Sequence, residues 1–403
     1  MTTIDLPRDT TLERVADSLA ILASSKASEM TMDWPTLARL VKTGGAKSIL
    51  SIGDLVEESW TDKSPAEPKE YSLPWGVRHF GTVELADGTT VDGMYLETQY
   101  AHVKGVQFSH QRAFLKCPEG LAAGTYYFTI ETKWGSNVAA GDVVCFTLTQ
   151  DVPAGGRIAG CYYAPDSTKD KWRIYSYSDA FTILETVTPT FEVSEGAVDL
   201  GIQKHSSRNG NINSCQEMAF GWNRWSTSAM RQYLNSAADK GAWWTPQDEF
   251  DIAPDQLTQI PGFLSGLPEE MVNAMLPVRT RTYLNTVNDT TEYGVAYDDT
   301  YDKVFLPSLN QMYVTADFTD EGETWDYWKL LSDGEKFKVY PAVYPQLIHY
   351  ATENRTSPQN VRLRSAYRWY AYNTWFVYST GFVHRRPACY SLPPVPACVI
   401  GRI

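Results

Sequence analysis

The stretch that decides how this chain folds lies near its end and reads Trp375-Phe-Val-Tyr-Ser-Thr-Gly-Phe-Val383. Successive side chains of a β-strand point to opposite faces of a sheet. Trp375 and Val377 are therefore expected on an inner face, and Phe376 and Tyr378 on an outer one. Substitutions on an outer surface usually change stability by no more than about 0.5 kcal/mol. The stretch thus predicts a half-buried strand whose outward side chains can change without loss of the fold.

The residues around this stretch have an unusual composition. From residue 354 to the end there is no Asp, Glu or Lys, but there are seven Arg, so the segment carries +7 while the whole chain carries −13. Tyr, Trp and Arg are enriched at binding surfaces. We expect such a surface here. A Tyr-rich β-core with a basic face remains an alternative, and the acidic remainder disfavours a nucleic-acid platform.

The preceding residues divide into three parts by pattern. Residues 1–45 are expected to form a helical segment, with apolar residues at helical spacing from Leu12 to Leu22 and a second short helix opened by Trp34-Pro35. Residues 46–200 show period-two runs and Gly turns, including a hairpin at Asp87-Gly88, and predict a sandwich-like β-module. Residues 201–403 predict an α+β domain.

Within residues 201–403, two helices and several strands are expected. Ser226-Thr-Ser228 offers N-cap chemistry, and Pro268 is expected in the first turn of a second helix, followed by two carboxylates. The strands are predicted at residues 279–284, 303–306, 362–364, 374–378 and 397–400.

The chain shows no sign of export or of membrane spanning. It has no run of eighteen apolar residues and no basic region followed by an apolar one at the N-terminus. The six cysteines form no metal-binding spacing, so they are expected to be reduced and mostly buried. Membrane partners are not expected.

Four segments together resemble a known family. They are Gly221-Trp-Asn-Arg-Trp-Ser, Gly266-Leu-Pro-Glu-Glu-Met, Asp302-Lys-Val-Phe-Leu-Pro-Ser, and the ending from Leu363-Arg-Ser through Pro396-Ala. The ending is similar to that of the variable proteins of diversity-generating retroelements, of which phage major tropism determinants are members. The resemblance covers about 200 residues and implies a C-type-lectin-like domain at residues 201–403.

The resemblance also implies a role for individual residues of the variable region, about residues 361–392. Positions expected to form the fixed scaffold are Leu363, Arg364, Ser365, Trp375, Val377, Gly381, Val383 and Pro396. Positions expected to vary and to contact a ligand are Tyr367, Tyr370, Tyr372, Asn373, Phe376, Tyr378, Phe382, His384, Arg385, Arg386, Tyr390 and Leu392.

The residue types in this region fit the diversification mechanism of that family. Randomising the two adenines of an Asn codon cannot give Lys, Glu, Gln, Met or Trp. From Val361 onward none of the first four occurs, and Trp375 belongs to the scaffold. Trp369 departs from the rule, so it must be fixed or have another codon.

The function implied by the resemblance is ligand binding. The protein would bind a host cell-surface protein or glycan as a phage tail adhesin, with residues 46–200 as the attachment module that joins other tail proteins. It would be a homo-oligomer, expected to be a trimer, located in the virion or in the bacterial cytoplasm before assembly. No enzymatic activity and no cofactor are expected.

Two rival functions and one metal site stay open. A formylglycine-generating-enzyme-like oxidoreductase shares the lectin-like fold and would need reactive cysteines, for which Cys389 and Cys398 are the nearby candidates. A structural virion protein without receptor specificity is the other rival. Calcium could bind carboxylates at Asp298, Asp299, Asp302 or residues 317–323, although their spacing matches no EF-hand loop.

Overall fold

The computed structural model of the chain describes residues 33–110, 115–130, 141–162, 171–175, 183–203, 221–247, 251–284, 297–315, 320–367 and 372–402. The expected helix from Leu12 to Leu22 lies outside these residues. The second expected helix is confirmed as α2 (Trp34–Lys42), whose N-cap Asp33 accepts a hydrogen bond from the Thr36 backbone. Gly44, in the left-handed region with a φ of 76°, ends it.

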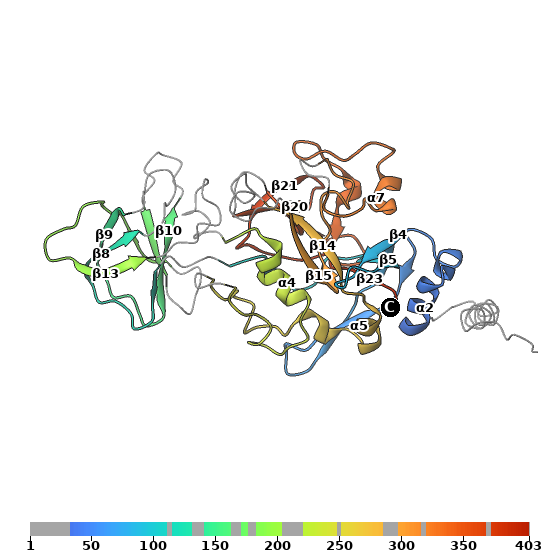
Figure 1. The fold of residues 1–403 in the computed structure, drawn as a ribbon, viewed down its shortest axis with the longest axis horizontal. Helices are drawn as coiled ribbons and strands as arrows, with labels where there is room; N and C mark the ends of the chain where they lie inside the picture. The colour runs from blue at the N-terminus through green and yellow to red at the C-terminus, as the bar shows by residue number, and fades with distance from the viewer. Residues whose placement is uncertain are drawn as a thin grey trace, which may run out of the picture.

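A five-stranded sheet joins the beginning and the end of the chain. Its strand order is β1-β4-β5-β23-β16, so the last strand of the chain lies between an early strand and a middle one (Figure 1). The expected hairpin at Asp87-Gly88 connects β4 to β5, and Gly88 has a φ of 80°. The bounds are β1 Leu55–Val56, β4 Trp75–Glu84, β5 Thr90–Thr98, β16 Val304–Phe305 and β23 Ala397–Ile400.

The structure divides the chain differently from the expected boundary at residue 200. One hydrophobic core runs from Trp34 through β4 and β5 to Ile400, so residues 33–110 and 221–401 form a single main body. Strands β4 and β5 belong to this main body because β23, near the end of the chain, pairs with β5 over four residues. Alternation along a strand shows that one face is buried but not which distant strand lies beside it, and for this reason the sequence boundary was wrong.

The sandwich-like module is therefore an insertion of residues 115–203. Two sheets, ordered β12-β11-β10-β7 and β13-β8-β9, enclose a second core that includes Phe128, Phe146 and Ile158. Figure 1 places this module at the opposite end of the molecule from α2. The bounds are β7 Leu115–Cys117, β8 Gly124–Ile130, β9 Val143–Leu148, β10 Gly156–Tyr162, β11 Lys171–Tyr175, β12 Ile183–Val187 and β13 Val198–Gln203.

Short helices cover the main body. Ser228 caps α4 by accepting a hydrogen bond from the Arg231 backbone, as expected. Pro268 is the N-cap residue of α5 rather than a residue of its first turn. The bounds are α4 Ala229–Leu234, α5 Glu269–Ala274 and α7 Asp326–Leu331, with 3₁₀ turns η1 Gly45–Ser48, η2 Trp225–Thr227, η3 Phe263–Gly266 and η4 Pro345–Leu347.

The remaining strands form small sheets on the main body. They are the pairs β2 Ser59–Asp62 with β3 Lys69–Ser72, β6 Val106–Gln107 with β22 Ser391–Leu392, β14 Val278–Tyr283 with β15 Tyr297–Asp302, and β17 His349–Tyr350 with β18 Pro358–Gln359. A three-stranded sheet holds β19 Val361–Ala366, β20 Asn373–Val377 and β21 Val383–Pro387. The described structure is thus mostly β with few helices. Among its helices, none has the length and hydrophobicity to cross a bilayer.

Candidate functional site

The two faces of the β19-β20-β21 sheet have different surroundings. Residues that lie opposite each other in antiparallel strands point to the same side. Val377 lies opposite Val361 and Val383, and all three belong to the main core. Phe376 lies opposite His384 and points to the other face, where it belongs to neither hydrophobic core. The expected opposition of Val377 and Phe376 is therefore confirmed.

That second face carries a group of aromatic and basic side chains, which we call the aromatic surface. The rings of Tyr378 and Phe382 are 4.0 Å apart between centroids, and Tyr340 lies 5.5 Å from Phe382 and 5.1 Å from His384. Tyr340 and Tyr390 are exposed, at 57% and 40%. The aromatic surface comprises Tyr340, Tyr378, Phe382, His384, Arg386 and Tyr390.

A smaller cluster lies on the opposite side of the β20–β21 pair. The rings of Tyr367 and Trp375 meet edge to face with centroids 5.1 Å apart, and the Arg385 guanidinium lies 4.8 Å from the Tyr367 centroid. Arg385 also donates a hydrogen bond of 2.8 Å to the Tyr367 hydroxyl. The candidate ligand-binding residues thus divide between two faces rather than forming one continuous patch.

Three residues expected at the variable surface are buried, and these expectations were wrong. Phe376 is fully buried, because Tyr378 packs on its ring at 4.4 Å and Arg386 lies above it at 5.9 Å. Asn373 is buried at the start of β20, and Leu392 is buried in β22, which pairs with β6. Strand alternation shows which way a side chain points but not whether a neighbouring side chain covers it.

The other predicted residues have intermediate or surface positions. Tyr367, Tyr372, Tyr378, Phe382, His384, Arg385 and Arg386 are half-buried, Tyr390 is exposed, and Tyr370 lies outside the described residues. All expected scaffold residues are buried except Trp375, which is half-buried against the main core. Burial and the neighbouring Arg385 lower the pKa of His384, so this imidazole is neutral at pH 7.

Arg362 holds the backbone beneath the aromatic surface. Its guanidinium, fully buried, donates hydrogen bonds to the carbonyl oxygens of Arg386, Pro387 and Tyr390 at 3.1, 3.0 and 2.8 Å. It also donates to the Thr374 hydroxyl at 2.6 Å. Burial lowers its pKa to about 9, which still leaves it charged at neutral pH. Three of the four acceptors are backbone atoms, so this support does not depend on the side chains at residues 386–390.

Two further side chains of the main body donate hydrogen bonds to carbonyl oxygens of the expected variable region, residues 361–392. Asn223 donates to the Asn373 carbonyl at 2.7 Å and to that of Tyr367 at 3.3 Å. Gln107, itself fully buried, donates to the Cys389 carbonyl at 2.9 Å. Asn223 belongs to the Gly221-Trp-Asn-Arg motif, so the sequence pointed to it, whereas no sequence signal marked Gln107.

Gly381, in the turn between β20 and β21, occupies a position that favours glycine in both backbone conformation and available space. Its φ is +89°, and a Cβ there would lie 2.2 Å from the Tyr344 carbonyl oxygen. The Tyr344 backbone donates a hydrogen bond to the Gly381 carbonyl, and the Tyr340 backbone donates to that of Val383. Backbone hydrogen bonds therefore hold residues 340–344 against the β20–β21 hairpin, and they place Tyr340 at the aromatic surface. The sequence reasoning missed Tyr340, since it lies outside the C-terminal pattern.

Arg364 and Ser365 attach β19 to the loop before and after residues 316–319. The buried Arg364 guanidinium donates to the Leu306 carbonyl at 2.6 Å and to the Glu321 carbonyl. Ser365 donates to the Glu321 carboxylate at 2.5 Å and accepts from the Leu309 backbone. Burial raises the pKa of Glu321, although the Arg364 charge acts in the opposite direction.

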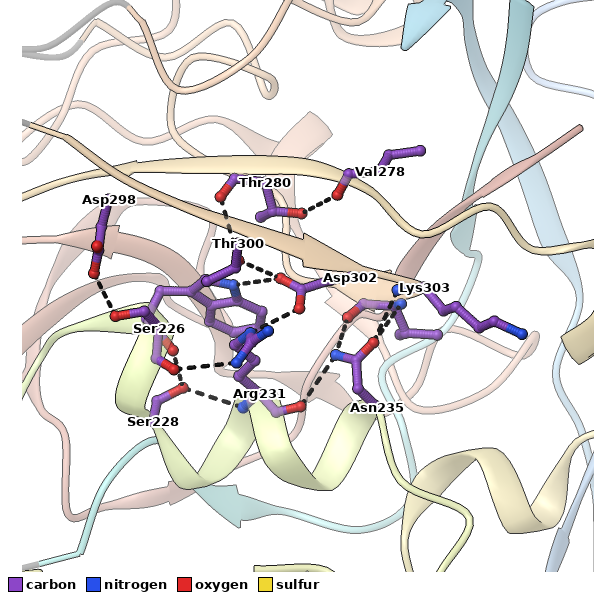
Figure 2. Close-up of polar contacts among 12 residues, drawn as sticks. Ser226, Ser228, Arg231, Asn235, Val278, Thr280, Asp298, Thr300, Asp302 and Lys303 are labelled. Atoms are coloured by element: carbon purple, nitrogen blue, oxygen red, sulfur yellow. Dashed lines mark hydrogen bonds and ion pairs between the residues drawn. The ribbon is translucent and has the colours of Figure 1, made fainter. Parts of the chain in front are cut away.

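The acidic residues considered for calcium are engaged by arginines instead. Figure 2 shows Asp302 of β15 directed at Arg231 of α4, which donates to it at 2.7 Å. Trp225 and Thr300 also donate to the Asp302 carboxylate, at 2.9 and 2.6 Å. Both oxygens of the Asp302 carboxylate therefore already accept hydrogen bonds. The bond from Arg231 also connects the β14–β15 strand pair to α4.

The neighbouring carboxylates have the same kind of partner. Asp298 accepts from Arg224 at 2.6 Å and from Ser226, and Asp299 pairs with Arg281 at 2.7 Å. Burial opposes ionisation of Asp298, but the hydrogen bonds from Arg224 and Ser226 hold its pKa below the usual value. No group of three or more possible metal ligands occurs among the residues that the structure describes. Residues 317–319 lie outside them.

The cysteines near the site are buried and free. Burial raises the pKa of Cys389 to about 12 and raises that of Cys398 as well. A thiol with so high a pKa is a poor nucleophile at neutral pH. Cys117 and Cys145 are also free and buried, as expected, while the side chains of Cys161 and Cys215 lie outside the described part.

The comparison with protein families gives one match. Residues 202–401 match a domain of unknown function, DUF6273. The matched segment contains the whole β19-β20-β21 sheet and the aromatic surface but not β4 and β5, which complete the main body. No curated protein matches the chain, and no solved structure matches it.

Proposed function

We propose that the chain is a ligand-binding variable protein of the diversity-generating-retroelement type, with a C-type-lectin-like main body and the aromatic surface as its binding site. Its ligand is a host cell-surface protein or glycan, and the protein acts as a phage tail adhesin. The inserted module at residues 115–203 would attach it to other tail proteins, in a trimer.

The observation that carries this proposal is the way in which the surface is supported. Arg362, Asn223 and Gln107 bond carbonyl oxygens of the segment that bears the candidate ligand-binding residues. Every residue has a carbonyl oxygen, so such bonds survive a change of side chain. A fold held in this way allows the outward residues to vary while the backbone stays in place, and outward aromatic residues can still carry much of a binding energy.

The rival functions have less support. An oxidoreductase of the formylglycine-generating type needs reactive thiols, whereas Cys389 and Cys398 are buried with raised pKa values. A structural virion protein without receptor specificity does not account for the exposure of Tyr340 and Tyr390 beside Phe382 and Arg386, because exposed patches of this kind mark interaction sites.

The DNA around the gene tests the proposal. We expect a near-copy of the sequence that encodes residues 361–392, differing mainly at adenines, beside a reverse-transcriptase gene. The codons of Tyr378, Phe382, His384 and Tyr390 should correspond to adenine-containing codons in that copy, and those of Arg362 and Gly381 should be identical in both. Flanking DNA with no such copy would refute diversification by a retroelement.

A further inference from the structure

Arg386 is a half-buried arginine without a carboxylate partner in the described part of the chain. Five arginines of the described structure pair with carboxylates, namely Arg78, Arg224, Arg231, Arg279 and Arg281. Arg386 forms no ion pair within the described part of the chain. Its Nε is buried without a hydrogen-bond partner, and its Nη1 donates only a long bond of 3.3 Å to the Tyr378 hydroxyl.

The position of Arg386 is nevertheless well defined. The guanidinium lies 5.0 Å from the ring centroid of Tyr390 and 5.9 Å from that of Phe376, and it is half-buried. The backbone of Arg386 is held by the bond from Arg362 to its carbonyl. A cation that is partly desolvated and lacks a counter-charge gains more than a solvated one from a carboxylate, which a guanidinium binds with two parallel hydrogen bonds.

The residues beside Arg386 define what could accompany the carboxylate. Phe382 and Tyr378 form an apolar wall, which Tyr340 extends. Tyr378 and Phe382 pack on each other with centroids 4.0 Å apart, and Tyr340, which is largely exposed, meets Phe382 edge to face at 5.5 Å. A protein segment with an Asp or Glu beside apolar residues supplies both a carboxylate for Arg386 and apolar side chains for this wall, whereas a neutral sugar supplies no carboxylate.

Resting on the proposed binding function, we propose that Arg386 is the anion-binding residue of the aromatic surface, and that the ligand is a protein segment with an Asp or Glu flanked by apolar side chains. The carboxylate binds the Nη atoms of Arg386, and the apolar neighbours pack on Phe382 and Tyr340. The β20–β21 hairpin forms one side of the proposed site. Residues 340–344, which lie outside the expected variable region, form the other side.

Short peptides test this inference on the full-length protein. The probe is acetylated and amidated Phe-Glu-Phe, its neutral match is Phe-Gln-Phe, and a hyaluronan tetrasaccharide supplies a carboxylate on a sugar. We expect Phe-Glu-Phe to bind about tenfold more tightly than Phe-Gln-Phe, as measured by NMR titration. Arg386→Gln should abolish that preference, and Arg386→Lys, which keeps the charge but not the planar fork, should reduce it.

The control is Arg402→Gln, which removes one exposed positive charge outside the aromatic surface and should keep the preference. Equal affinity of the wild-type protein for both peptides, no binding of either, or binding of the tetrasaccharide alone would overturn the inference. The inference would also be overturned if Phe382→Ala bound neither peptide while Arg386→Gln left the ratio of the two peptide affinities unchanged. That last result would leave the proposed function of the surface standing.

Discussion

The substitution Arg362→Met examines the frame under the aromatic surface. Methionine keeps much of the volume of the arginine stem but removes every donor of the guanidinium. Three carbonyl oxygens, those of Arg386, Pro387 and Tyr390, then lose the hydrogen bonds from Arg362. We expect a loss of stability because these bonds come from a charged donor that is fully buried.

The magnitude follows from the count of lost bonds. A hydrogen bond from a charged donor contributes about 1.5–3 kcal/mol, and we take the lower limit for each carbonyl because that of Pro387 keeps a bond from the Tyr390 backbone. Removal of the buried charge of Arg362, whose pKa is lowered to about 9, returns part of the cost. The expected net loss is about 3 kcal/mol, which lowers the melting temperature of a body of this size by about 6–12 °C.

Urea denaturation followed by tryptophan fluorescence measures this loss, with Arg385→Met as the matched control. Arg385 lies on β21 of the same sheet, separated from β19 by β20, and is half-buried, so its replacement should cost about 1 kcal/mol or less. Equal stability of wild type and Arg362→Met would refute the reasoning that these carbonyls depend on the arginine.

Three further predictions concern the scaffold. Gly381→Ala should destabilise by more than about 2 kcal/mol because its Cβ would meet the Tyr344 oxygen, whereas Gly88→Ala, with φ +80° but open space, should cost about 1 kcal/mol; equal losses in thermal melts would contradict the steric argument. Asp302→Asn should cost about 3–5 kcal/mol in urea because Arg231 loses its buried partner, and a loss below about 1 kcal/mol would show that the pair is dispensable. Burial lowers the pKa of His349 from 6.5 to about 4, so folding favours the neutral form and stability falls as pH drops from 6.5 to 4, by about 3 kcal/mol at most; His349→Gln should flatten this fall in pH-dependent melts, and an unchanged slope would count against it.

The local elements of the main body could be predicted because their signals are local. The cap at Ser228, the turn at Asp87-Gly88 and the strand at residues 374–378 each depend on a few neighbouring residues, and the structure confirms all three. The side of the sheet to which Val377 and Phe376 point was also predictable from alternation.

The global arrangement could not be predicted in the same way. Pairing of β23 with β5 joins residues that are about 300 positions apart, and nothing in either strand specifies the other. For this reason, residues 46–110 were assigned to the wrong part. The burial of Phe376 depends on Tyr378 and Arg386 folding over it, which a pattern of polar and apolar residues does not reveal.

The positive charge of the C-terminal segment also had a different meaning from the one expected. Two of its seven arginines, Arg362 and Arg364, are fully buried and bond carbonyl oxygens. The sequence showed the absence of acidic residues correctly, but only the structure distinguishes arginines that support the backbone from those, such as Arg386, that lie at the aromatic surface.

Tolerance to randomisation tests the central claim most directly. One library would vary Phe382, His384 and Tyr390, and a second would vary Arg362, Phe376, Gly381 and Ser365, with protease resistance of each displayed variant as the readout. The account predicts that most members of the first library resist protease within about 1 kcal/mol of the wild type and that most members of the second are cleaved as unfolded chains. Equal sensitivity of the two libraries would contradict the claim that an unchanging frame holds an exchangeable surface.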